Sequence, residues 1–204
     1  MGIFRKTCYT VLNMKYRRNI EGKGYIHYKP WLTHFIIRKS AHINLKDKLI
    51  IGENSYGNNK RSNLIRLDED AVLEVKGKFM FMYGADVIVF KGGHLVLGEN
   101  SFINSDCKIR CHKNISIGND CAISHDFIIM DSDAHFLNGD NRTKDVIIED
   151  NVWIGTRVTV LSGTRIGTGS VVAAGSVVNI DIPPHSLAAG VPARVIRTDI
   201  KWSK

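Results

Sequence analysis

A six-residue period is the feature that most constrains how this chain can fold. From residue 148 the sequence divides without remainder into the hexads IEDNVW, IGTRVT, VLSGTR, IGTGSV, VAAGSV and VNIDIP. The first position of every hexad is aliphatic, and the fifth is small or β-branched. An α-helix would scramble such a period, and chance alternation in a β-sandwich would not sustain it. The pattern predicts a solenoid of short strands in which three hexads close one coil of about eighteen residues.

A second block keeps the same period closer to the N-terminus. Its first positions are Leu67, Leu73, Phe79, Ala85, Lys91, Leu97, Ile103 and Ile109, and only Lys91 fits poorly. Two extra residues near 115–116 shift the frame, which resumes at Ile117. The predicted solenoid spans residues 43–183 and stops at Pro183 and Pro184. A tail follows over residues 184–204.

The repeat is interrupted once for a long stretch, at about residues 130–147. This segment is polar, contains Gly139 and shows no repeat. In a solenoid, an insertion forms a loop that projects from one face, and such loops often carry function.

The charge of the chain is concentrated before the repeats. The net charge is +8, and residues 1–40 hold nine Lys or Arg and a single acid, so residues 41–204 are neutral. A neutral solenoid disfavours nucleic-acid binding. The charge predicts a basic N-terminal arm over residues 1–42, partly helical because its apolar residues Phe4, Cys8, Val11 and Leu12 have helical spacing. Packing of this arm on its own body or a neighbour is favoured over a peripheral contact with anionic lipid.

Targeting signals and cysteine spacing favour a cytoplasmic protein. The N-terminal stretch lacks the apolar core of a signal peptide, and no segment has the length of a membrane span. The four cysteines have neither zinc-ribbon spacing nor the density of a disulfide scaffold, which predicts reduced thiols. Association with the inner face of the membrane through the basic arm remains an alternative location.

Four motifs carry a specific resemblance: DNVWIG, AAGSVV, DIPP and GVPARVIR. As a set they resemble the bacterial hexapeptide-repeat acyltransferases, in particular the branch of galactoside, maltose and surface-polysaccharide O-acetyltransferases. The likeness covers about residues 43–197. It implies an all-β, left-handed parallel β-helix, a homotrimer, acetyl-CoA as the donor and active sites between neighbouring subunits.

Moving an acetyl group from a thioester to a hydroxyl requires a base, and an imidazole can serve at neutral pH. His135 lies in DSDAHF, where the repeat gives way to the loop, and the resemblance places the catalytic histidine there. Asp131 and Asp133 are near enough in sequence to orient its imidazole or, equally, to cap the turn.

The resemblance also suggests residues for the acceptor. Asn104 matches an asparagine that binds acceptor hydroxyls, and His112 stands where sugar acetyltransferases carry an acid. His125 occupies an outward position, as a surface histidine or as a substrate contact. Asp133 and Trp153 complete the expected acceptor side.

For the donor, the resemblance points to the C-terminal hexads and the tail. Small residues would let the pantetheine arm of acetyl-CoA lie along the coils, and basic residues would bind its phosphates; the candidates are Trp153, Gly155, Ala173, Ala174, Arg194 and Arg197. Small residues are also what the repeat itself requires. Ile180 replaces a lysine common in relatives, which removes one expected contact.

These features predict an acetyl-CoA-dependent O-acetyltransferase of a sugar or polysaccharide precursor of a capsule, lipopolysaccharide or exopolysaccharide. The alternatives are an acetyltransferase of a small acceptor, such as a nucleotide-linked amino sugar or an antibiotic, and a non-catalytic scaffold. A zinc site like that of γ-type carbonic anhydrases is disfavoured, because that site needs two histidines five apart, a pair that His112, His125 and His135 do not form.

Overall fold

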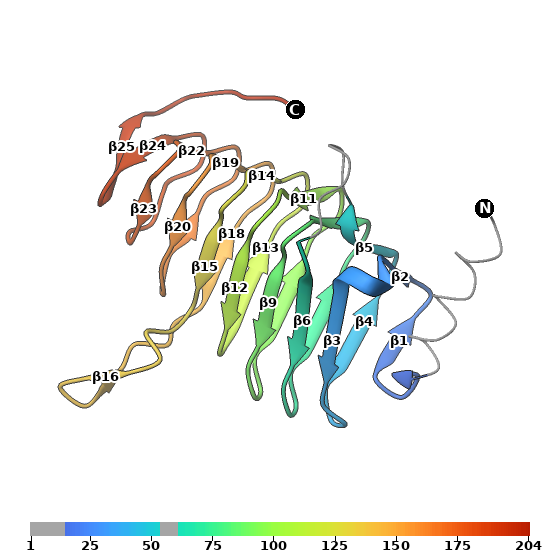
Figure 1. Cartoon of the computed structure of the whole chain (residues 1–204). Coiled ribbons are helices and arrows are strands. Elements are labelled where there is room, and N and C mark those ends of the chain that lie inside the picture. Colours follow the sequence, from blue (N-terminus) through green and yellow to red (C-terminus); the bar gives the residue numbers. More distant parts are fainter. Residues whose placement is uncertain (1–14, 54–60) are drawn as a thin grey trace.

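The chain winds as a parallel β-helix in a computed structural model that describes residues 15–53 and 61–204 (Figure 1). Strands pass in turn through three long sheets, here called A, B and C. Neighbouring strands in these sheets are parallel, except for the antiparallel last pair of sheet B. The predicted β-helix is therefore confirmed.

Each sheet collects one strand from every coil. Sheet A consists of β1 (Ile20–Gly22), β4 (His42–Leu45), β7 (Val72–Val75), β10 (His94–Leu97), β13 (Asn114–Ile117), β18 (Val146–Ile148) and β21 (Arg165–Ile166). Sheet B consists of β2 (Tyr25–Tyr28), β5 (Lys48–Glu53), β8 (Phe79–Met82), β11 (Ser101–Ile103), β14 (Ala122–Ile123), β19 (Trp153–Ile154), β22 (Val171–Val172), β24 (Leu187–Gly190) and β25 (Ala193–Arg197). Sheet C consists of β3 (Thr33–Ile37), β6 (Asn63–Leu67), β9 (Asp86–Val89), β12 (Lys108–Cys111), β15 (Ile128–Met130), β20 (Thr159–Val160) and β23 (Val177–Val178).

Three corners join the sheets and define where side chains can meet. The chain turns from sheet A to sheet B at the AB corner, from B to C at the BC corner, and from C back to A at the CA corner. The short 3-10 helix η1 (Pro30–Leu32) lies at the first BC corner. Residues at one corner of successive coils stack in a line along the helix axis.

The coils narrow along the chain, which corrects the expectation of a uniform coil of three hexads. Val72 pairs with His94, and His94 pairs in turn with Asn114, so both of these coils are longer than three hexads. Only near the C-terminus does a coil shorten to three hexads, where Trp153 pairs with Val171. The wider coils form because their strands are longer and each sends two side chains inward, as Leu73 and Val75 do from β7.

An aliphatic column fills the β-helix along its whole length. The wide coils are filled by large side chains such as Phe79 and Phe81, which are at most 1% exposed. In the narrow coils small hydroxyl residues are buried, and their hydroxyl groups bond to the backbone. The Ser170 Oγ donates to the Pro183 carbonyl at 2.8 Å, and the Ser176 Oγ donates to the Ala173 carbonyl at 2.7 Å. The small fifth position of the hexads therefore reflects the narrow interior.

Both expected boundaries of the solenoid need correction. The first coil starts at Ile20, inside the region 1–42 assigned to a separate arm, because β1 pairs with β4 in full register. At the other end, β24 pairs with β22 beyond Pro183 and Pro184, so one further strand of sheet B follows the prolines. The expected helical positions between Phe4 and Leu12 lie outside the described residues.

The three cysteines in the described part of the chain, Cys107, Cys111 and Cys121, are free thiols in the core. Burial raises the pKa of the Cys107 thiol to about 12 and that of the Cys121 thiol to about 11. These thiols are therefore protonated packing residues. Across residues 15–53 and 61–204, no helix has the length and apolar character needed to cross a membrane.

Candidate active site

A loop projects from the CA corner between β15 and β18, as predicted (Figure 1). Its tip is a two-stranded antiparallel hairpin, β16 (Phe136–Leu137) and β17 (Asp140–Asn141). Asn138 and Gly139 form the turn with φ values of 52° and 83°. An Asn-Gly pair is a strong hairpin signal. That signal is present in the sequence, although the interruption of the repeat alone predicts only a loop.

Asp131 holds the foot of this loop. Its side chain is fully buried, and the carboxylate accepts hydrogen bonds from the backbone N–H groups of His112, Lys113 and Asn114 at 2.7–2.8 Å. Its own carbonyl accepts from the Lys144 N–H at 2.9 Å, which fixes the other end of the loop. Both carboxylate oxygens are thus engaged by the preceding coil. Of its two expected roles, the structure supports the cap and not the orientation of His135.

His135 lies exposed between this foot and the hairpin. The preceding residue, Ala134, has a φ of 57°, and its N–H donates to the Ser132 Oγ at 3.0 Å. Asp133 is also exposed and lines an open pocket of about 730 Å³ together with Asp140, Asn141, Arg142, Lys144, Leu161, Ser162 and Asn179. The predicted base therefore stands on a projecting segment beside a polar hollow.

His112 lies at the same corner, one coil earlier. Its ring stacks on Phe90 with centroids 3.9 Å apart and planes inclined by 16°. Its backbone N–H is one of the three that bond to Asp131. The ring is held flat against the coil below and therefore occupies a defined position at the base of the loop.

Two other predicted acceptor residues, Asn104 and His125, lie at the BC corner. Asn104 follows β11, and its side-chain oxygen accepts from the Ser105 N–H at 2.8 Å. His125 follows β14 one coil later and is exposed, and its carbonyl accepts from the Arg157 N–H at 3.0 Å. The structure therefore does not bring Asn104 and His125 together with His135 in one copy of the chain.

The predicted donor residues gather on sheet B and at the BC corner. Trp153 starts β19, and its indole points outward with 44% of the residue exposed. Register pairs it with Val171, which pairs with Leu187, which in turn pairs with Arg197. At about 4.8 Å per strand, Trp153 and Arg197 lie about 14 Å apart along one row of outward positions.

Small residues leave room beside this row. A Cβ at Gly155 would lie 2.6 Å from the Ala174 backbone nitrogen, so these two coils need glycine to stack closely. Ala174 and Gly175 are exposed, and a Cβ at Gly175 would meet nothing within 4 Å. Ala173 precedes them at the same turn. An extended ligand could therefore lie along this corner without displacing side chains.

The two arginines of the tail are placed on the edge strand β25. Arg194 and Arg197 are both exposed. Neither guanidinium pairs with a carboxylate within the part of the chain that the structure describes, and Arg194 Nη1 donates to the Ala193 carbonyl at 2.7 Å. Two unpaired guanidinium groups at one edge can bind an anionic group.

The candidate residues thus form two groups on different parts of the β-helix. One group, at the CA corner, contains His112, Asp133 and His135. The other, on sheet B and the BC corner, contains Asn104, His125, Trp153, Gly155, Ala173, Ala174, Arg194 and Arg197. Sheet C separates the two corners, and β12 alone spans about 13 Å at 3.3 Å per residue. The structure therefore divides the candidate residues of a single copy between two places.

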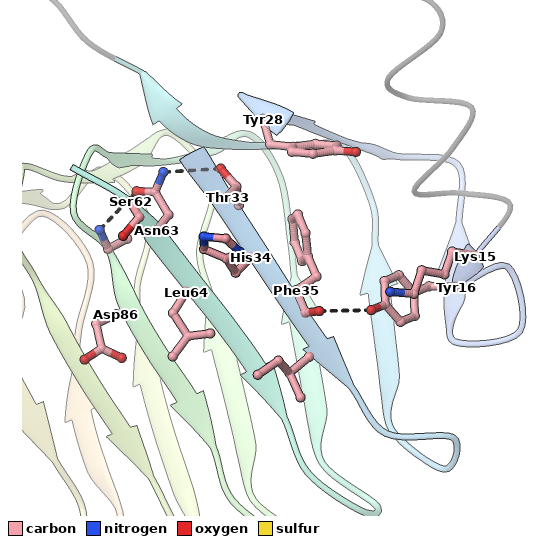
Figure 2. A pocket seen from close by; sticks show the side chains of 12 residues that line it. Lys15, Tyr16, Tyr28, Thr33, His34, Phe35, Ser62, Asn63, Leu64 and Asp86 are labelled. Carbon is pink, nitrogen blue, oxygen red and sulfur yellow. Dashed lines mark hydrogen bonds between the residues drawn. The ribbon is translucent and has the colours of Figure 1, made fainter. Parts of the chain in front are cut away.

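Another cavity lies elsewhere and contains none of the predicted residues. It has a volume of about 820 Å³ and lies on the outer face of sheet C in the first coils (Figure 2). Asn63 in its wall is a structural residue, since its amide bonds to the Leu32 carbonyl at 3.1 Å and to the Thr33 Oγ1 at 3.2 Å. Three strand steps of sheet C separate β6 in this wall from β15 at the loop.

Comparison with known proteins supports the relationship that the motifs suggest. The bacterial transferase hexapeptide family (six repeats) matches residues 145–179. The polysialic acid O-acetyltransferase of Escherichia coli O1:K1 / APEC is 32% identical over 126 residues, which are 58% of this chain and 41% of that protein. The galactoside O-acetyltransferase of Escherichia coli K12 is 36% identical over 112 residues, 52% of this chain and 55% of that protein. The chain spans less than two thirds of the length of these curated relatives.

Structural similarity extends over most of the chain. The crystal structure of the polysialic acid O-acetyltransferase OatWY has a TM-score of 0.60 and 25% identity, and the match covers 91% of this chain and 90% of that one. This likeness shows that the β-helix is left-handed. The family match falls where the coils have shortened to three hexads, and the wider coils before it continue the same fold. Residues 145–179 of the chain therefore belong to the bacterial transferase hexapeptide family.

Proposed function

We propose that the protein is an acetyl-CoA-dependent O-acetyltransferase that modifies a sugar hydroxyl, with His135 as the general base. The observation that carries this proposal is an exposed histidine on a projecting loop whose foot is fixed by a buried carboxylate. Such a foundation holds a reactive side chain in a defined place while leaving it open to substrate. A scaffold without activity would not require it.

The chemistry follows from what an imidazole can do. The acceptor oxygen attacks the thioester carbonyl while His135 takes the hydroxyl proton, and a carbon–oxygen bond forms. The carbon–sulfur bond then breaks, and His135 returns the proton to the CoA sulfur. General base assistance of this kind typically contributes about 10²–10⁴-fold.

Acetyl-CoA fits the surface of sheet B. Trp153 would flank the pantetheine end, Gly155, Ala173 and Ala174 would let the arm lie against the backbone, and Arg194 and Arg197 would bind the phosphates. The row of outward positions from Trp153 to Arg197 and the open space at Gly175 support this placement. The curated relatives are named O-acetyltransferases, and such a transfer needs an activated acetyl group of the kind that a thioester provides.

A neighbouring copy would complete each site. His135 and the donor surface lie on different corners, so a homotrimer would bring the loop of one copy to sheet B of the next. The hairpin tip supports this arrangement, because Phe136 is 72% and Leu137 is 53% exposed in the single chain. Adjacent apolar side chains on a projecting tip suggest a protein contact.

The acceptor class is inferred from the relatives. Both curated relatives are named for the O-acetylation of sugars, one of a polysialic acid and the other of galactosides. We infer a polysaccharide or its precursor as the acceptor, bound between Asp133 and His112 on the loop side and Asn104 and His125 on the other. A small sugar is the second candidate for the acceptor, because the chain is 36% identical to a galactoside O-acetyltransferase.

Release of free CoA tests the proposal. Wild-type protein with acetyl-CoA and either sialic acid oligomers or galactosides should release CoA, and His135→Ala should lower kcat by about 10²–10⁴-fold. His42→Ala, on the outer face of sheet A, serves as the matched control and should retain full turnover. Unchanged turnover in His135→Ala would refute the assigned base. A wild type that neither binds acetyl-CoA nor releases CoA would instead indicate a scaffold.

A further inference from the structure

Residues 198–204, here called the strap, run back along the AB corner after β25 (Figure 1). The Ile200 N–H donates to the His185 carbonyl at 2.9 Å, the Trp202 Nε1–H to the Asn151 carbonyl at 2.8 Å, and Lys204 Nζ to the Asn100 carbonyl at 2.7 Å. The three acceptors belong to corners of different coils. The strap therefore connects several coils by hydrogen bonds, and it runs along the helix axis from the C-terminal coils back toward the N-terminal ones.

The strap has the alternation of an extended segment with one face on the protein. Ile200 and Trp202 are half-buried, whereas Lys201 and Ser203 are exposed. Lys204 also lies 3.9 Å from the Asp120 carboxylate and 5.9 Å from the centroid of Phe102. Neither the hexad repeat nor the proposed donor surface accounts for this ordered course.

Trp202 meets the tryptophan assigned to the donor surface. The ring centroids of Trp153 and Trp202 are 6.0 Å apart, with planes inclined by 43°. This separation lies within the range in which aromatic pairs attract each other. The Nε1–H bond to Asn151, two residues before Trp153, holds the Trp202 ring on the AB side of Trp153. The row of Val171, Leu187 and Arg197 runs from Trp153 along the helix axis, through the strands that follow β19 in sheet B.

We propose that Trp202 is a positioning residue for the donor site, which holds the Trp153 indole in the orientation that receives acetyl-CoA. This inference rests on the proposed function, because the ligand it concerns is the proposed donor. Without this contact, the Trp153 indole, which belongs to a residue that is 44% exposed, would sample several rotamers. Binding of acetyl-CoA would then have to order it. The strap orders it in advance.

The expected signature is an effect on donor binding. Loss of the aromatic contact in Trp202→Ala should raise the KM for acetyl-CoA by about three- to tenfold, while kcat and the acceptor KM change less than about twofold. Trp202→Phe keeps a ring beside Trp153 and should restore most of the donor affinity. Trp31→Ala, which removes an exposed tryptophan on η1, should leave the donor KM unchanged.

A spectroscopic readout separates positioning from general stability. In a Trp31→Phe background, Trp153 is the remaining tryptophan in both Trp202→Ala and Trp202→Phe. Acrylamide should quench Trp153 emission more strongly in the alanine variant than in the phenylalanine variant, with thermal unfolding of both still cooperative. If Trp202→Ala fails to fold, Trp202→Phe is compared with wild type instead. The proposal is overturned if acrylamide quenches Trp153 freely in this variant while its affinity for acetyl-CoA is unchanged.

Direct titration of CoA distinguishes the two levels of inference. If wild type binds CoA and Trp202→Ala binds it equally well, the positioning role is wrong and the proposed function stands. If wild type neither binds CoA nor turns over acetyl-CoA, the proposed function fails and the inference fails with it. A three- to tenfold weaker Kd in Trp202→Ala, with rescue by phenylalanine, supports the positioning role.

Discussion

At the scale of single residues, Asp131 and Asp133 differ because the strand alternation of β15 ends between them, so Asp131 is buried and Asp133 is exposed. Both precede His135 within four residues, and the motif alone leaves their roles open. In β15 the side chain of Ile129 is buried, and two residues later that of Asp131 is also fully buried, whereas Asp133 is exposed. Continuing the two-residue alternation past Met130 would have predicted a buried carboxylate. The exposure of His135 follows only from the loop, which leaves the coil after Asp131.

Replacing Asp131 with asparagine should weaken the foot of the loop. The carboxylate receives three N–H donors, and an amide would turn its NH₂ group toward at least one of them. We expect Asp131→Asn to lower the free energy of unfolding by about 1–3 kcal/mol, measured by urea denaturation. Asp133→Asn is the matched control and should unfold like wild type. Equal stability of the two variants would show that the buried bonds are not needed.

At the scale of elements, the hexad pattern predicted the β-helix but not the size of its coils. Lys91 fits the predicted frame poorly because the coils around it, in which Val72 pairs with His94 and Asp86 with Lys108, are longer than three hexads. Because six is a multiple of two, the inward positions of a longer strand still coincide with first positions of the hexad frame. Aliphatic residues in the wider coils therefore appear to follow the six-residue period. The start at Ile20 could not be read from the pattern, because the first coils are longer still and therefore show no hexad.

The AB corner links consecutive narrow coils through Glu149, and this link should depend on pH. One carboxylate oxygen accepts from Arg165 Nε at 2.7 Å, and the other accepts from the Thr168 N–H at 2.7 Å and Oγ1 at 2.8 Å. The bonds from Thr168, followed by Arg165, lower the pKa of Glu149 from its usual 4.5. The stabilising contribution is therefore present above about pH 4.5 and is lost as the pH falls through the lower folded pKa.

Glu149→Gln should therefore reduce stability by about 1 kcal/mol at neutral pH. The difference from wild type should shrink as the pH falls below about 4.5, because wild type then loses the same charge. Thermal unfolding between pH 3 and pH 7 measures this convergence. Glu99→Gln changes an exposed glutamate at the same corner of an earlier coil and should show no such trend. A constant difference across the pH range would contradict the role of the Glu149 charge.

At the scale of the whole molecule, the structure changes the meaning of the basic N-terminal region. Four of its charges, Lys23, Lys29, Arg38 and Lys39, belong to the first coil and its turns, while Lys15, Arg17 and Arg18 are exposed just before it. The charge therefore marks one end of the β-helix. A contact of this end with anionic lipid stays a prediction. The arginines proposed to bind the donor, Arg194 and Arg197, lie on β25 near the other end of the sheets.

In the proposed homotrimer, His135 and the proposed donor surface would come from different copies, as the family resemblance implies, so activity would depend on the assembly. Two inactive variants with lesions in different halves should therefore complement each other. Coexpression of His135→Ala with the double variant Arg194→Ala/Arg197→Ala forms mixed rings in which some interfaces join an intact loop to an intact donor surface. With random mixing in equal amounts, about a quarter of the interfaces are of this kind, so we expect up to about a quarter of wild-type turnover.

The control places both lesions in the same half. Trp153→Ala mixed with Arg194→Ala/Arg197→Ala carries both defects on sheet B, so no interface gains an intact donor surface unless one lesion is mild by itself. Each variant is therefore first assayed alone, and the mixed activity is compared with the mean of the two. Activity well above the mean only in the mixture containing His135→Ala would support sites shared between copies. The absence of complementation in a mixture shown to contain mixed assemblies would mean that loop and donor surface act within one copy, which the separation across sheet C makes physically difficult.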